Sequence, residues 1–148
     1  MQWARFAVWG VVATVGVGGV ALAADALVES DEERIADVAD ALTDPRAERR
    51  IDALLAWVDP SRVSVTVRAD GRAERFEEGD GDPAGSIRDA LAPLEDGSLE
   101  VVQRSITVEG DHAHVALRVR SDGELVDAQV GLRRDGQAWL VDDVRRID

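Results

Sequence analysis

The sequence predicts an α+β domain in which three helices from the N-terminal half pack on an antiparallel sheet. Apolar residues recur at helical spacing over residues 35–58, and they alternate with polar residues over 63–67 and again after residue 100. Pairs of glycine and aspartate then divide the C-terminal half into four segments of strand length. An apolar segment at residues 6–24 precedes the domain.

This apolar segment predicts export from the cytoplasm. Residues 6–24 are uncharged, follow a single positive charge at Arg5 and end near Ala21-Leu22-Ala23, an A-x-A cleavage pattern. At about 1.5 Å per residue the segment is about 28 Å long, close to the roughly 30 Å hydrocarbon core of a membrane. Residues 1–23 are therefore expected to be a cleaved signal peptide or an N-terminal anchor in the inner membrane, and 24–29 a linker.

The charge distribution predicts where the domain, residues 30–148, resides and which partners it lacks. Acidic residues follow the leader and its only basic residue precedes it, so the domain is expected outside the cytoplasm, periplasmic, secreted or anchored. The net charge of −13 disfavours nucleic acid and anionic lipid as partners, because both need a positive surface. Membrane contact is then limited to residues 6–24, if they are uncleaved. The absence of cysteine excludes disulfides, thiolate catalysis and Cys-ligated zinc, and no cofactor is expected.

The first two helices are predicted from their caps and apolar stripes. Ser30 followed by Glu33 forms a capping box that opens the first helix. Its stripe, at i, i+3, i+4 and i+7, consists of Ile35, Val38, Ala39 and Leu42. Asp44-Pro45 opens the second helix, with aspartate as N-cap and proline at the first helical position. The second stripe runs through Ile51, Leu54, Leu55 and Val58, until Asp59-Pro60 ends the helix.

A hairpin and a short helix are predicted next. A strand is indicated where Val63, Val65 and Val67 alternate with polar residues. Asp70-Gly71 is a two-residue hairpin signal that leads into a short partner strand at residues 72–77. Asp82-Pro83 opens the third helix, which carries Ile87, Ala90 and Leu91 and is ended by Pro93.

Three two-residue turns predict a four-stranded meander in the C-terminal half: Gly110-Asp111, Asp122-Gly123 and Asp135-Gly136. Each turn fixes which residues face each other. The middle turn pairs only apolar residues, namely Ala113/Leu132, Val115/Val130, Leu117/Ala128 and Val119/Val126. The first turn places Val108, Ile106, Arg104 and Val102 opposite the same inner residues. The third places Trp139 and Val141 opposite Leu132 and Val130, so that one apolar face results.

The order of elements, and the closing segment 136–144 with the sequence GQAWLVDDV, resembles the nuclear transport factor 2-like superfamily. This superfamily includes SnoaL-like cyclases and ketosteroid isomerases. The resemblance covers about residues 30–148 and implies a cone, in which helices and a curved sheet enclose a pocket. The isomerases use a carboxylate base and an oxyanion site that commonly contains tyrosine. This chain has no tyrosine and no residue that matches the base, so the activity is not carried over.

The predicted register leaves three charged residues on the apolar face, namely Arg104, Asp143 and Arg145. Arg104, Leu117, Ala128 and Asp143 share one row, and small Ala128 leaves space above the sheet. A ligand pocket is therefore predicted, with Arg104 as the cation that binds a small polar or anionic ligand, Asp143 beside it and Trp139 as an apolar wall. Two alternatives stay open: a structural ion pair, or a bulge that turns these side chains toward water.

Other candidate sites are weaker. His112 and His114 alternate on the outer face with Arg118 and Arg120, but register offers His112 only Glu109 and Arg133, so no metal site is predicted. Arg118 opposite Asp127 indicates an exposed cross-strand pair. No motif for a nucleophilic triad, a P-loop or a dinucleotide site is present.

These observations favour an exported, non-catalytic module of the cell envelope that binds a small ligand or a protein. One alternative is a small SnoaL-like or isomerase-like enzyme with Asp143 as general base inside the cone. A second alternative is a membrane-anchored envelope-assembly component that forms a homodimer through the outer face of its sheet. The depth at which Asp143 lies discriminates the enzyme from the module.

Overall fold

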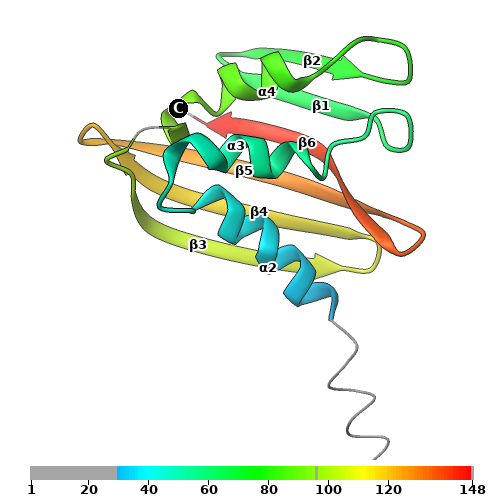
Figure 1. The fold of residues 1–148 in the computed structure, drawn as a ribbon, viewed down its shortest axis with the longest axis horizontal. Helices are drawn as coiled ribbons and strands as arrows, with labels where there is room; N and C mark the ends of the chain where they lie inside the picture. Colours follow the sequence, from blue (N-terminus) through cyan, green and yellow to red (C-terminus); the bar gives the residue numbers. More distant parts are fainter. Residues whose placement is uncertain (1–29, 96, 148) are drawn as a thin grey trace, which may run out of the picture. The chain divides into compact units, whose positions relative to one another are not determined.

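The computed structural model describes residues 30–95 and 97–147, and the predicted leader lies outside them. Residues Asp31–Asp148 form one compact unit (Figure 1). None of the helices in the described part is long and apolar enough to cross a membrane.

The helices form where the sequence predicts them, but the second is shorter than expected at both ends: it ends at Leu55, so Val58 of its predicted stripe lies beyond it. Helix α2 (Asp31–Leu42) buries the predicted stripe of Ile35, Val38, Ala39 and Leu42. Helix α3 (Ala47–Leu55) begins later than expected, because Asp44 Oδ1 accepts the backbone N–H of Arg46 at 2.7 Å and forms a turn before the helix. Helix α4 (Ala84–Ala90) follows Asp82, whose carboxylate accepts the Ala84 N–H at 2.9 Å. Pro93 lies in a short 3-10 helix, η1 (Ala92–Glu95).

Six strands form one sheet in the order β2-β1-β6-β5-β4-β3. The hairpin of β1 (Val65–Ala69) and β2 (Arg72–Phe76) turns at Asp70-Gly71 as predicted. The meander consists of β3 (Glu100–Glu109), β4 (His112–Ser121), β5 (Glu124–Asp135) and β6 (Ala138–Ile147). The hairpin joins the meander through a parallel pairing of β1 with β6, which no local sequence pattern predicts.

The first two turns of the meander set the predicted register. Every predicted pair between β4 and β5 is present, and β3 pairs with β4 as expected from Glu109 to Arg104. The one difference is a bulge between Val101 and Gln103, which places Val101 opposite Val119 where Val102 was expected.

The third predicted register is wrong, for two reasons. The chain turns at Gly136-Gln137, so Asp135 pairs with Ala138, and Leu132 faces Val141 where Trp139 was expected. A bulge then inserts Asp142 between the pairs Leu132/Val141 and Gly131/Asp143. An extra residue reverses the alternation of side chains beyond it. Asp143 and Arg145 therefore leave the apolar face, and Val144 and Arg146 take their places.

Gly131 lies opposite this bulge and makes room for it. A Cβ atom at Gly131 would lie 2.7 Å from Asp142 Oδ1 and 3.1 Å from Asp143 Cβ. Both aspartates thus project over the glycine on the same side of the sheet.

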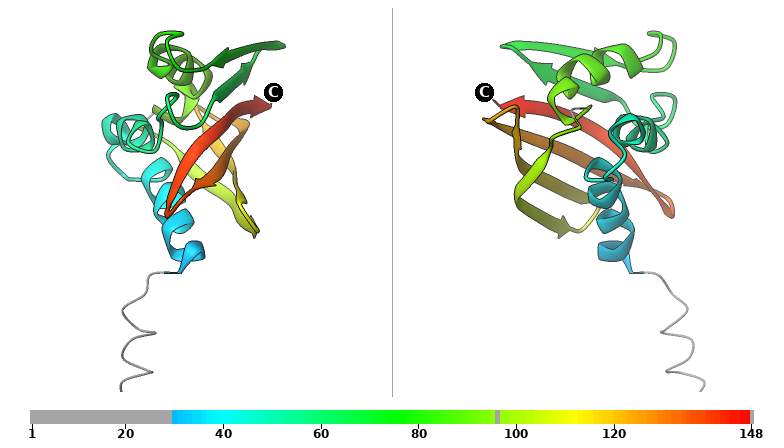
Figure 2. Two further views of the ribbon diagram at one scale, coloured as in Figure 1. Left: turned by 90° about the vertical axis from the view of Figure 1, so that its right-hand side faces the viewer. Right: turned by 60° about the vertical axis from the view of Figure 1, so that its left-hand side comes forward.

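The helices cover one face of the curved sheet, the inner face, and leave the opposite, outer face without helices (Figure 2). Side chains from both layers fill the cone with one apolar core, whose residues are at most 5% exposed. Its largest fully buried members are aliphatic: Ile35, Leu42, Ile51, Leu54, Ile87, Leu91, Leu94 and Leu132.

We expect Gly131→Ala to lower the free energy of unfolding by about 1–3 kcal/mol, because Asp143 Cβ is backbone-linked and cannot move freely from the added methyl group. Gly85→Ala is the control, since a Cβ atom at that helical position meets no other atom within 4 Å and should add up to about 1 kcal/mol of stability. Urea midpoints measure both changes. A Gly131→Ala variant as stable as its parent would contradict this role of Gly131 in the bulge.

Candidate functional site

The predicted row of Arg104, Leu117 and Ala128 exists on the inner face, but its fourth member is Arg146. Leu117 pairs with Arg104 and with Ala128, and Ala128 pairs with Arg146. The prediction that Asp143 occupies this place is wrong, because the bulge at Asp142 moves it to the outer face. The structure thus separates Asp143 from the other three predicted site residues by the thickness of the sheet.

Arg104 is bound by helix α2. Its guanidinium donates to Asp40 Oδ1 at 2.5 Å and to the backbone oxygen of Ala36 at 3.4 Å. The side chain remains about one-third exposed, so the contact is a partly solvated ion pair that fastens the edge strand β3 to α2.

Arg146, which was not among the predicted site residues, makes a more buried connection. Its side chain is only 14% exposed; it donates to the backbone oxygen of Ala90 at 3.3 Å and forms an ion pair with Asp70. Arg146 thereby links β6 to α4 and to the β1–β2 turn. The sequence does contain a signal for this placement. Val141 and Val144 are three residues apart, whereas apolar residues on one face of a regular strand are two apart, and Arg146 follows Val144 by two residues.

Asp143 lies between two arginines on the outer face. It forms an ion pair with Arg68, and its Oδ2 lies 3.9 Å from Arg145 Nε. The side chain is one-quarter exposed and does not face the interior of the cone.

Trp139 fastens the start of α2 to the sheet. Its indole N–H donates to Asp31 Oδ1 at 3.1 Å, and the Arg134 guanidinium lies 5.1 Å from the ring centroid while also pairing with Asp31. The hydrogen bond from Trp139, followed by that from Arg134, lowers the pKa of Asp31. Trp139 therefore helps to attach the start of α2 to the sheet, at the opposite end of β6 from Arg146.

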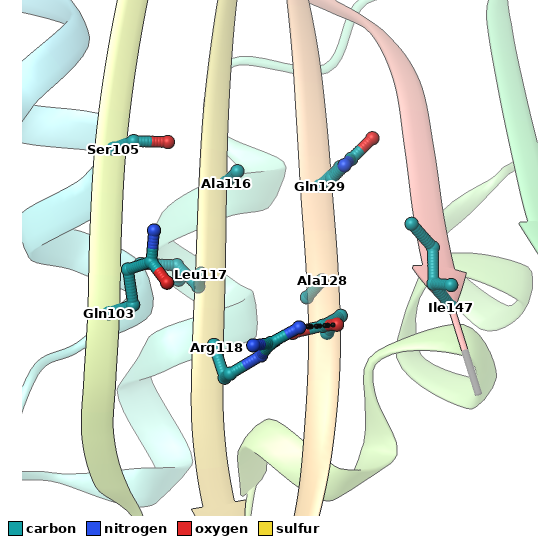
Figure 3. Close-up of a pocket in the computed structure, with 9 residues that line it drawn as sticks. Gln103, Ser105, Ala116, Leu117, Arg118, Ala128, Gln129 and Ile147 are labelled. Carbon is teal, nitrogen blue, oxygen red and sulfur yellow. Dashed lines mark hydrogen bonds and ion pairs between the residues drawn. The ribbon is translucent and has the colours of Figure 1, made fainter.

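Ala128 borders a hollow on the outer face of the sheet (Figure 3). Its own side chain is buried on the inner face, so it contributes its backbone to the floor. The hollow has a volume of about 170 Å³ and exists because Ala116 is small, while longer side chains surround it. Its walls come from β3, β4, β5 and β6: Gln103, Ser105, Arg118, Asp127, Gln129 and Ile147.

The polar groups around the hollow are of two kinds. Arg118 donates two hydrogen bonds of 2.8 Å to the carboxylate of Asp127, the cross-strand pair that register predicted. This pairing lowers the pKa of Asp127 and raises that of Arg118. In the described part of the chain, Gln103, Ser105 and Gln129 have no side-chain partner, so their hydrogen-bonding groups are available to another molecule.

Exposed apolar residues lie at the same end of the sheet. Leu125 is 57% exposed and Ile147, which borders the hollow, is 41% exposed. Val101 and Val102, at the start of β3, are also exposed. His112 and His114 lie on the outer face as expected, and among residues 30–95 and 97–147 no three His, Cys, Asp or Glu residues are placed to hold a metal ion.

Comparison with known proteins establishes the fold. The chain matches no protein-family model and no curated protein. A protein of Shewanella frigidimarina, provisionally named a ketosteroid isomerase, has a solved structure with TM-score 0.57 and 16% identity over 80% of this chain and 96% of that one. An NTF2-like protein from Cytophaga hutchinsonii gives TM-score 0.52 and 10% identity over 80% and 98%.

The hub of CaMKII from S. rosetta gives TM-score 0.52 and 14% identity over 82% of this chain and 98% of that one. At these identities the likeness is one of fold alone. The domain thus has the nuclear transport factor 2-like cone fold, with three helices on a curved sheet, as the sequence predicts. The six-stranded sheet is mixed where an antiparallel one was expected, because β1 pairs parallel with β6.

Proposed function

We propose that this domain is a non-catalytic association module of the cell envelope, and that it pairs with a second copy through the outer face of its sheet. The observation that carries the proposal is the contrast between the two faces. The inner face is packed with apolar side chains, whereas the outer face presents a hollow, unpartnered amide groups and exposed apolar residues.

The position of Asp143 argues against the enzyme alternative. A general base in the cone needs a carboxylate that faces the interior, with its pKa raised by burial. Asp143 instead lies on the outer face of the sheet, where it pairs with Arg68 and lies near Arg145, so it cannot reach a ligand inside the cone.

The distribution of charge favours the outer face for self-association. The chain carries a net charge of −13, so two copies repel each other unless their contacting surfaces are less acidic than the rest. On the outer face arginines and carboxylates balance: Arg68, Arg75, Arg118, Arg120, Arg133 and Arg145 against Glu100, Glu109, Asp127, Asp135, Asp142 and Asp143. The excess of acidic residues lies on the helices and loops.

The edges of the sheet are protected against pairing with another strand. Edge strand β3 contains a bulge at Val101 and Gln103, and Arg104 points inward from its middle. The other edge, β2, is five residues long and rich in charge. Bulges, inward charges and short edges are the features that prevent edge-to-edge association. A partner is therefore expected to contact a face of the domain and not an edge strand.

The hollow provides the contact expected of a two-fold interface. A two-fold axis brings the same patch of both copies together, so the space above Ala116 receives a side chain of the other copy. Ile147, Gln103 and Gln129 then surround that side chain with apolar surface and hydrogen-bonding groups.

We expect residues 30–148 to form a concentration-dependent dimer in sedimentation experiments. Ala116→Arg fills the hollow and adds a like charge from each copy, so it should weaken the dimer at least about tenfold. Ala56→Arg, at an exposed position after α3, is the matched control and should leave the dimer unchanged. A domain that stays monomeric at the highest concentration, or a dimer that Ala116→Arg leaves intact, would rule out this interface.

The proposed location in the cell envelope rests on the leader. Residues 6–24 are uncharged, with one basic residue before them and acidic residues after them. We expect residues 1–30 to carry a fused reporter enzyme out of the cytoplasm, and replacement of Val12 and Val15 by aspartate to block this. Reporter activity confined to the cytoplasm with the unmodified leader would refute export.

A further inference from the structure

We propose that the groove between α4 and the β1–β2 hairpin binds a free α-amino acid. The groove has a volume of about 220 Å³ and lies on the inner side of the hairpin, apart from the hollow of the outer face. Pockets for drug-sized ligands occupy about 300–1,000 Å³, so this groove fits a smaller molecule. The site is independent of the proposed pairing of outer faces.

Two connections hold the walls of the groove in place. The Ser86 hydroxyl of α4 donates to Glu74 on β2 at 2.6 Å. Arg146 binds the backbone oxygen of Ala90 and forms an ion pair with Asp70 at the turn of the hairpin. The groove is thus preformed, because helix and hairpin are joined at both of its ends.

Two opposite charges on the walls are left for a ligand. Arg72 on β2 and Asp89 on α4 both line the groove, and within the described residues neither has a hydrogen-bond or ion-pair partner. The other two charged residues of the lining, Asp70 and Glu74, are already occupied by Arg146 and Ser86.

An α-amino acid carries the groups that complement these walls. Its carboxylate accepts two parallel hydrogen bonds from the guanidinium of Arg72, and its ammonium donates to the carboxylate of Asp89. The apolar part of the groove, formed by Val67, Ala69 and Ala90, contacts the side chain of the ligand. A ligand with only one charge leaves one of the two residues unmatched.

Titration of residues 30–148 with L-alanine and L-leucine, followed by NMR, tests the site. We expect shifts of the Val67, Ala69 and Ala90 amides with a Kd on the order of 1 mM, because the groove is open to water. The N-acetyl and amide derivatives, which each lack one charge, should bind at least about tenfold more weakly, the effect of one charged hydrogen bond.

Three variants separate a built site from surface charge. Arg72→Gln and Asp89→Asn should each weaken binding at least about tenfold. Arg75→Gln is the control, since Arg75 lies on the other side of the same strand and bonds to Glu77 and Ser64. The proposal is overturned if neither amino acid shifts these amides, if acetate binds as tightly as alanine, or if Arg72→Gln binds like the parent domain.

Discussion

A single extra residue in strand β6 determines which side chains the cone contains. The bulge at Asp142 fits only because Gly131 lacks a side chain, and it reverses the alternation of every later residue in the strand. Asp143 and Arg145 consequently join the outer face, while Arg146 enters the inner face and connects α4 to the hairpin. Without the bulge, two charged residues would enter an apolar core and Val144 would be exposed to water.

The two faces of the sheet consequently have different roles. Apolar side chains from the helices and the inner face fill the cone, so its interior contributes stability through the burial of apolar surface. Arginines and carboxylates neutralise each other on the outer face, which makes this the surface where a second copy of an acidic chain meets the least repulsion. The groove beside α4 lies on the inner side of the hairpin, and Arg146, which the bulge turns inward, joins two of its walls by binding Ala90 and Asp70.

Local sequence signals were sufficient for most of the fold. Turns at Gly110-Asp111 and Asp122-Gly123 set the register of β3, β4 and β5, because two-residue turns permit one pairing. The prediction for the third turn was wrong. Asp135-Gly136 has the same composition as the other turns, but the chain turns one residue later, at Gly136-Gln137. The candidate site depended on that register, so Asp143 was expected on the inner face, although it lies on the outer one. The partner of Arg104 on α2 also could not be predicted, because no local pattern specifies how a helix packs across a sheet.

Thiol labelling of single-cysteine variants tests the bulge most directly, because the chain has no cysteine of its own. With the bulge in place, position 145 lies on the outer face and position 144 in the core. Arg145→Cys should react in the native domain within about tenfold of its rate in denaturant. Val144→Cys should react at least about a thousandfold more slowly than in denaturant, because its thiol becomes accessible only when the sheet opens. Rapid reaction at position 144 together with protection at position 145 would show that β6 alternates without the bulge, and that Asp143 faces the cone.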